Sequence, residues 1–175
     1  MNFRLGTSRK TLFFLALANA ILLSAGWMMA LYAYPRLPES IPMWMNFLGQ
    51  QILLSTKSLL FFLYPASQTL FCFIYGSLQK IMLKKMAISG QSIPASRLKA
   101  EFALLSLIFF NLLFIHLQRS IILTAHGLEE GVSEYYFFSL FGIILALIPY
   151  YRIRGKILMK KESLTRGREN NSYRT

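Results

Sequence analysis

The sequence predicts an all-α integral membrane protein with four transmembrane helices and with both termini in the cytoplasm. Three observations support this fold class: an apolar composition, four long apolar stretches, and basic residues that cluster beside those stretches. Of the 175 residues, 55% are hydrophobic and 15% are charged, and the mean hydropathy is +0.45. A soluble domain of this length usually contains fewer apolar and more charged residues.

Each of the four apolar stretches is long enough to cross a bilayer. The first, residues 12–34, carries no charge and would span about 34 Å as a helix, against a hydrocarbon core of about 30 Å. The second, residues 53–78, contains Lys57 near its start, and the third covers residues 102–123. The fourth, residues 135–151, begins and ends with a pair of tyrosines, which are typical of membrane interfaces.

The distribution of lysine and arginine predicts the orientation. All but three of the basic residues lie in the N-terminal segment 1–11, in the linker 79–101 and in the tail 152–175. Because cytoplasmic loops of membrane proteins carry the excess of basic residues, we expect these three segments inside the cell. The exceptions, on the opposite side, are Arg36, Lys57 and Arg119.

The net charge of +12 would suggest nucleic-acid binding in a soluble protein. Here the basic residues flank the spans, where they set the topology and meet anionic lipid headgroups. We therefore expect membrane lipids and no nucleic acid among the partners. The sequence leaves the oligomeric state open.

The spans form two predicted helical hairpins. The first, residues 12–78, encloses an outer segment rich in proline and aromatic residues, 35–52. The second, residues 102–151, encloses an acidic outer loop, 120–134. The tail begins as a continuation of the fourth helix and is then expected to be irregular, because its second half is polar.

Helix association in lipid depends on close packing of small residues and on buried polar groups. Ala16, Ala20 and Ser24 form a small-residue stripe at a spacing of four, which predicts the packing face of the first helix. Asn19 lies beside that stripe and needs a partner in the bundle. Pro65 lies in the middle of the predicted second helix, where it would remove a backbone hydrogen bond and kink the helix.

The outer segment between the first two spans is the most distinctive part of the chain. It holds three of the six prolines within eight positions, Pro35, Pro38 and Pro42, which exclude a regular helix and favour extended backbone. The apolar residues that follow are expected at the membrane interface or over the helix ends, and Gly49 permits the turn towards the second helix. These apolar residues are Met43, Trp44, Met45, Phe47 and Leu48.

Between about residues 31 and 65, the sequence resembles a bacterial membrane domain known as domain of unknown function 1648. The resemblance rests on a proline-rich pattern, on Thr56-Lys57 where the domain has serine-lysine, and on Pro65 in the next helix. Two positions depart from it, because Trp44 replaces the usual histidine and Met45 replaces an aromatic residue. The matching residues of the pattern are Tyr34, Pro35, Leu37, Pro38, Glu39, Ile41, Pro42, Asn46 and Gly49.

The same domain is similar to the first part of bacterial immunity proteins that protect against a sporulation-delaying toxin. The resemblance therefore implies a multi-pass protein of a bacterial cytoplasmic membrane. It also implies a binding role at the outer face and contact with a repressor at the inner face. If the histidine of the family binds a metal, moves a proton or recognises a ligand, Trp44 implies that this chain has lost that group.

The absence of catalytic motifs favours a non-enzymatic binding or accessory module, immunity-like or sensor-like, without a cofactor or a metal. The chain has no aspartate, no Walker loop and no nucleophile elbow, and its single cysteine, Cys72, excludes an internal disulfide. Lys57 either reaches the interface along its own stem or pairs with Glu39 or Asn46 and holds the proline segment over the bundle. The residues expected to meet a peptide, lipid or membrane partner are Trp44, Met45, Asn46 and Phe47.

Two other functions stay open. A small transporter or channel subunit would line a path across the membrane with Lys57, His116 and Arg119, together with Asn111. A metal-dependent membrane enzyme would bring the two histidines together with glutamates of the acidic outer loop, although the sequence contains no HExxH signature. The residues concerned are His116, His126, Glu129, Glu130 and Glu134.

Overall fold

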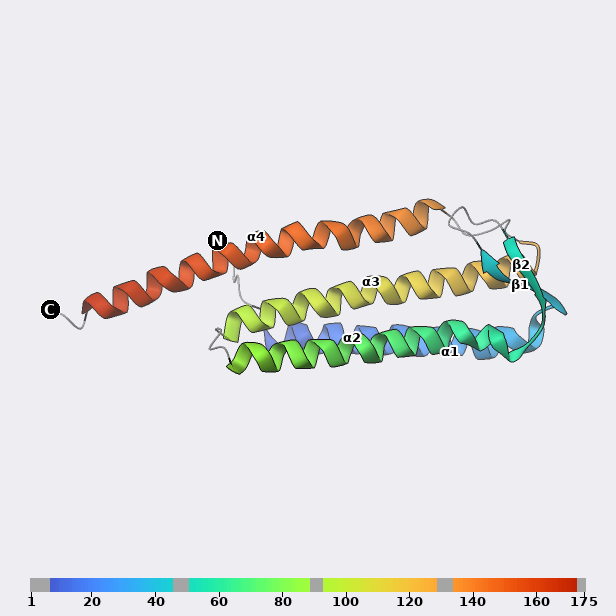
Figure 1. Ribbon diagram of the computed structural model, residues 1–175, viewed down its shortest axis with the longest axis horizontal. Coiled ribbons are helices and arrows are strands. Elements are labelled where there is room, and N and C mark those ends of the chain that lie inside the picture. Colours follow the sequence, from blue (N-terminus) through green and yellow to red (C-terminus); the bar gives the residue numbers. More distant parts are fainter. Residues whose placement is uncertain (1–6, 46–50, 89–92, 129–133, 173–175) are drawn as a thin grey trace.

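A computed structural model describes residues 7–45, 51–88, 93–128 and 134–172 of the protein (Figure 1). Within these residues, four long helices form the bulk of the chain and a β-hairpin follows the first helix. The helices are α1 (Arg9–Ala33), α2 (Leu63–Ile88), α3 (Ile93–Ala125) and α4 (Glu134–Ser172). The strands are β1 (Ser40–Met45) and β2 (Gln51–Thr56), flanked by the 3-10 turns η1 (Tyr34–Arg36) and η2 (Leu59–Phe62).

The protein is a multi-pass membrane protein. Four stretches of the described residues are long and apolar enough to cross a membrane, namely 9–36, 59–81, 94–125 and 138–161. The predicted all-α fold with four transmembrane helices is therefore confirmed. Large apolar side chains such as those of Phe13 and Phe73 are exposed on the bundle surface, as expected where lipid is the solvent.

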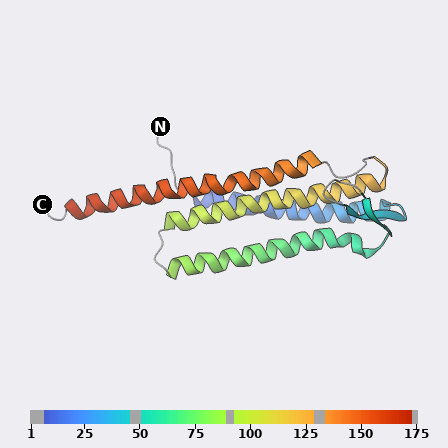
Figure 2. The same ribbon diagram turned by 45° about the horizontal axis from the view of Figure 1, so that its top comes forward.

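Helix α3 is the centre of the bundle. α1, α2 and α4 each pack against α3, and β1 contacts it as well. Two views of the chain show α4 lying along α3, away from α2, and extending past the ends of the other helices (Figures 1 and 2). The buried side chains of α4 lie on the face that meets α3, and they are Leu140, Ile144, Tyr151 and Leu158.

The packing face of α1 differs from the predicted one. The buried residues of α1 are Asn19, Gly26, Ala30 and Ala33, whereas the predicted stripe of Ala16, Ala20 and Ser24 is exposed. That prediction is wrong because the polar Asn19 has to face the interior, where it finds hydrogen-bond partners that lipid cannot supply. Turning Asn19 inwards carries the small-residue stripe out to the surface.

The first residues of the predicted second helix form a strand instead. β2 pairs antiparallel with β1, so that Ser40 lies opposite Thr56 and Ile41 lies opposite Ser55. An apolar run alone does not distinguish a strand from a buried helix. Here the prolines keep the preceding segment extended, and pairing with β2 satisfies its backbone hydrogen-bonding groups.

Two further predictions about this region are wrong for the same reason. Lys57 follows β2 and lies outside α2, which begins at Leu63. Pro65 is the third residue of α2 and not its middle. Proline is tolerated in the first turn of a helix, so Pro65 gives no reason to expect a kink.

The helices also extend further than the apolar stretches. α2 continues to Ile88 and α3 begins at Ile93, so most of the predicted basic linker is helical. α4 runs through Pro149 and on to Ser172, and the second half of the tail is therefore helical and not irregular. The polar ends of these helices leave the apolar part of the bundle without a change of backbone structure.

Gly26 gives a stability test of this packing. A methyl group at Gly26 would overlap Oε1 of the buried Gln68, whereas nothing lies within 4 Å of a Cβ placed at Gly76. We expect the Gly26→Ala variant to be less stable than Gly76→Ala by about 1–3 kcal/mol, measured by reversible unfolding in mixed micelles. Because both variants gain the same helix propensity, the difference isolates the contact. Equal stabilities would contradict the packing of α1 against α2.

Candidate functional site

The β-hairpin is anchored in the bundle by a buried apolar cluster. Ile41 of β1 and Phe61 of η2 are fully buried, and they pack with Ala30 of α1 and Ile121 of α3. Leu37, which lies between α1 and β1, completes the cluster. The hairpin lies at the end of the bundle where α1 and α3 finish (Figure 1). Its base is therefore part of the core and not a loop resting on the surface.

Lys57 fixes the backbone at the base of the hairpin. Its Nζ donates hydrogen bonds to the carbonyl oxygens of Pro35 and Leu37, both at 3.1 Å, and lies 5.3 Å from the ring centroid of Tyr34. Its backbone N–H donates to the carbonyl of Glu39 at 2.6 Å. Lys57 thus holds the proline segment through backbone carbonyls, while the Glu39 side chain is exposed.

The register of the hairpin explains why Pro42 fits in a strand. Because Lys57 bonds to Glu39, the alternation of an antiparallel ladder makes Ile41 and Ser55 the next hydrogen-bonded pair. Pro42 lies opposite Leu54, at a non-hydrogen-bonded position where its missing N–H removes no ladder bond. Pro42 is also buried, so it contributes to the anchor.

The residues predicted to meet a partner lie towards the other end of the hairpin. Beyond Pro42 the register shifts, so that Trp44 lies opposite Leu53 and Met45 lies opposite Gln51. Such an irregularity is typical of a β-bulge, which increases the local twist of a strand. Three residues of the predicted site fall outside the described part of the chain: Asn46, Phe47 and Gly49.

A hydrogen-bonded chain of amide side chains crosses the interior of the bundle. Asn111 of α3 is 1% exposed, donates to Oδ1 of Asn19 in α1 at 2.9 Å, and accepts from Nε2 of Gln68 in α2 at 2.9 Å. Asn19 in turn donates to the backbone carbonyl of Leu104 in α3 at 3.0 Å. The Sγ of Cys72 lies 3.3 Å from Oδ1 of Asn111, the oxygen that also accepts from Gln68. The Asn111 side chain therefore joins α1, α2 and α3.

The expectation that Asn19 needs a partner in the bundle is confirmed. Sequence reasoning missed Gln68, although the signal was the same: a lone amide in an apolar stretch. Gln118 extends the polar interior, because its Nε2 donates to the carbonyl of Gly26 at 3.2 Å. Buried polar groups within spans hold membrane helices together by such bonds.

The four residues predicted to line a path lie in separate places. Asn111 faces α1 and α2, whereas His116 packs on α4, where its ring centroid lies 4.0 Å from that of Tyr136. Arg119 is exposed, and Lys57 precedes the start of α2 and lies at the base of the hairpin. The structure does not bring these side chains together along one passage.

A second polar cluster lies at the opposite end of the bundle. Glu101 of α3 accepts hydrogen bonds from Tyr151 and Arg154 of α4, both at 2.8 Å, and from the hydroxyl of Thr7 just before α1. The cluster ties α4 and the N-terminal segment to α3. Sequence reasoning missed Glu101, whose signal is a single acidic residue within a basic segment.

The described residues contain no group of three or more His, Cys, Asp or Glu side chains that could hold a metal ion. His126 is exposed, and Glu129 and Glu130 lie outside the described residues. No family model matches the chain, and no curated protein or solved structure matches it. The candidate function therefore rests on the geometry of the hairpin and of the bundle.

Lys57 allows a local test of the hairpin anchor. Lys57→Met keeps an apolar stem but removes the bonds from Nζ to the carbonyls of Pro35 and Leu37. We expect faster amide hydrogen exchange in β1 and β2 with little change in the melting of the bundle, because the anchor acts locally. Arg36→Met is the matched control, since Arg36 donates to Tyr32 within the end of α1. Unchanged protection of both strands in the Lys57 variant would rule out this role.

Asn111 allows a test of the interior network. Asn111→Leu keeps the number and the branching of the side-chain heavy atoms but leaves Asn19 and Gln68 without their shared partner. We expect the free energy of unfolding in mixed micelles to fall by about 1–2 kcal/mol, the upper part of the range for hydrogen bonds between transmembrane helices. Cys72→Ala removes only a weak donor and should have a smaller effect. An Asn111→Leu protein as stable as the wild type would contradict the central position of this side chain.

Proposed function

We propose that the protein is a non-enzymatic membrane binding module that presents its β-hairpin to a partner. The observation that carries this proposal is the anchoring of the hairpin. Ile41 and Leu37 build its base into the core, and Lys57 fixes the backbone beside it. A segment that only connected two spans would need neither device. A rigid base lowers the entropy lost on binding, which is the advantage of a preorganised surface.

The composition of the hairpin supports the same proposal. Met43, Trp44 and Met45 end β1, and Phe47 follows in the sequence. Aromatic residues and methionine are enriched in binding surfaces because they offer large contact areas. A peptide, a lipid or a membrane protein is the kind of partner that such residues would contact.

The proposed orientation follows from the basic segments. If the positive-inside rule holds for this chain, both termini lie in the cytoplasm and the hairpin lies outside the cell. The resemblance of residues 31–65 to domain of unknown function 1648 supports a bacterial cytoplasmic membrane and an immunity-like or sensor-like role. Trp44 in place of the family's histidine suggests an apolar contact at that position.

A comparison of two variants tests the proposal. Wild-type protein, a Trp44→Ala/Asn46→Ala variant and a Tyr135→Ala variant are each extracted in native-lipid particles and analysed by mass spectrometry for bound proteins, peptides and lipids. We expect a stoichiometric companion of the wild type to be depleted at least several-fold from the hairpin variant. We expect the hairpin variant to lose the companion because the hairpin would supply the main contact area.

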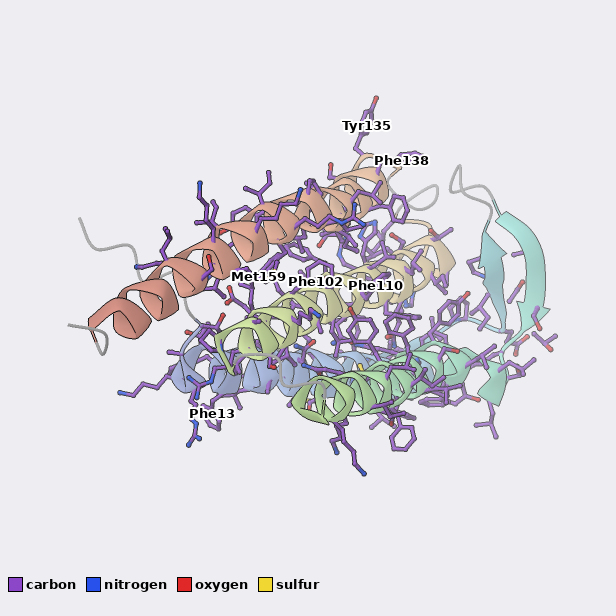
Figure 3. All side chains as sticks on the ribbon, turned by 60° about the vertical axis from the view of Figure 1, so that its left-hand side comes forward. Phe13, Phe102, Phe110, Tyr135, Phe138 and Met159 are labelled. Atoms are coloured by element: carbon purple, nitrogen blue, oxygen red, sulfur yellow. The ribbon has the colours of Figure 1, made fainter. Side chains whose placement is uncertain are left out.

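Tyr135→Ala is the matched control. Tyr135 is an aromatic residue at the start of α4 that is 88% exposed and points away from the bundle (Figure 3). The control should retain the companion at the wild-type level. Retention by the hairpin variant, or the absence of any stoichiometric companion in the wild type, would count against the proposed function.

A further inference from the structure

We propose that His116 is a proton-binding site that water reaches from the hairpin end of the bundle along Ser120 and Thr124. The three residues follow one another on α3 at a spacing of four, so they lie along one side of the helix with neighbouring Cβ atoms about 5–6 Å apart. All three are buried, with exposed fractions of 7%, 0% and 7%. A single water molecule can bridge neighbouring polar groups at this spacing.

The two hydroxyl groups indicate that water belongs there. Ser120 Oγ and Thr124 Oγ1 are buried, and no group in the described residues forms a hydrogen bond with them. Buried polar atoms are rarely left without partners, least of all within a membrane. Bound water usually supplies the missing hydrogen bonds at such positions. Thr124 is the penultimate residue of α3, so this row of hydroxyls ends beside the hairpin.

The contact with Tyr136 makes His116 suited to carry a positive charge. The two ring centroids lie 4.0 Å apart with the ring planes tilted by 35°, and the face of an aromatic ring attracts a cation. Imidazole is also the side chain that gains and loses its proton near physiological pH. An ionisable residue within a span is by default a candidate for function.

The elements around this part of α3 bring few competing charges. α1, α2 and β1 contribute no charged side chain at this end of the bundle. The nearest charged residues in sequence on the two packed helices are Arg119 of α3 and Glu134 of α4. The tyrosines and the cysteine of these elements are Tyr32, Tyr64, Cys72, Tyr75, Tyr135, Tyr136, Tyr150 and Tyr151, and the titratable groups beyond the helix ends on this side are Tyr34, Arg36, Glu39, Lys57 and His126.

The uptake of a proton needs no other reactant. A hydronium ion at the surface gives its proton to the outer end of the hydrogen-bonded row and remains as water, and along the row each hydroxyl accepts on its outer side and donates on its inner side. The imidazole ring then carries one additional proton and one positive charge. No covalent bond between heavy atoms forms or breaks.

The small number of histidines makes the test direct. The chain contains two, His116 and His126, so a His126→Gln protein with ¹⁵N-labelled histidine has a single labelled imidazole ring. In lipid nanodiscs, we expect the two ¹⁵N signals of this ring to change reversibly from those of neutral imidazole to those of imidazolium when the pH is lowered from about 8 to 5. Exchange of the ring N–H with water should be rapid. A ring that stays neutral over this range and does not exchange with water would overturn the proposal.

The path of the water is tested separately in the same His126→Gln background. Ser120→Ala combined with Thr124→Val removes both hydroxyls at nearly constant volume, and we expect several-fold slower exchange of the ring N–H with water. Ser106→Ala is the matched control, because Ser106 is another buried serine of α3, ten positions before His116. Ser120→Ala alone serves if the double variant does not fold, as judged by circular dichroism. Exchange at the wild-type rate without the hydroxyls would overturn the proposed path.

Discussion

The pairing of polar side chains inside the bilayer is the constraint on which the arrangement of the helices depends. Lipid offers no hydrogen-bond partners, so the amides of Asn19, Gln68 and Asn111 have to find one another. They do so at one point, where Asn111 of the central helix contacts both neighbours. Rotating α1 enough to bury its small-residue stripe would carry Asn19 into lipid. Gly26, which is buried on α1 together with Asn19, leaves the room that the Gln68 side chain occupies.

The spans could be predicted from the sequence because their signal is strong and local. Length, apolar content and flanking charges each report on the membrane without reference to the rest of the fold. The start of α2 could not be predicted in this way. The predicted second span begins at Leu53, within β2, and only the pairing of residues 51–56 with a proline-rich strand makes this segment extended. The rotation of α1 depended in turn on a residue in α3 that lies 92 positions away from Asn19.

The candidate site was predicted in part. Sequence reasoning left two roles open for Lys57, either reaching the interface along its own stem or holding the proline segment through Glu39 or Asn46. In the structure its Nζ holds that segment through the carbonyl oxygens of Pro35 and Leu37 and not through a carboxylate. Every residue has a backbone carbonyl, so the order of charged residues in the sequence does not indicate which carbonyl Lys57 binds. Glu101 was missed because its partners come from α4 and from the segment before α1, which no spacing along the chain brings together.

The length of α4 has a mechanical consequence. Its 39 residues extend about 58 Å as a continuous helix, and among the long helices it rests chiefly on α3. A stiff rod that is supported along one side acts as a lever. A tilt of about 5° at the hairpin end would displace the far end by about 5 Å, given that length. Small changes where His116 meets Tyr136 would therefore be amplified on the opposite side of the membrane, where the Glu101 cluster sets the resting position of the rod.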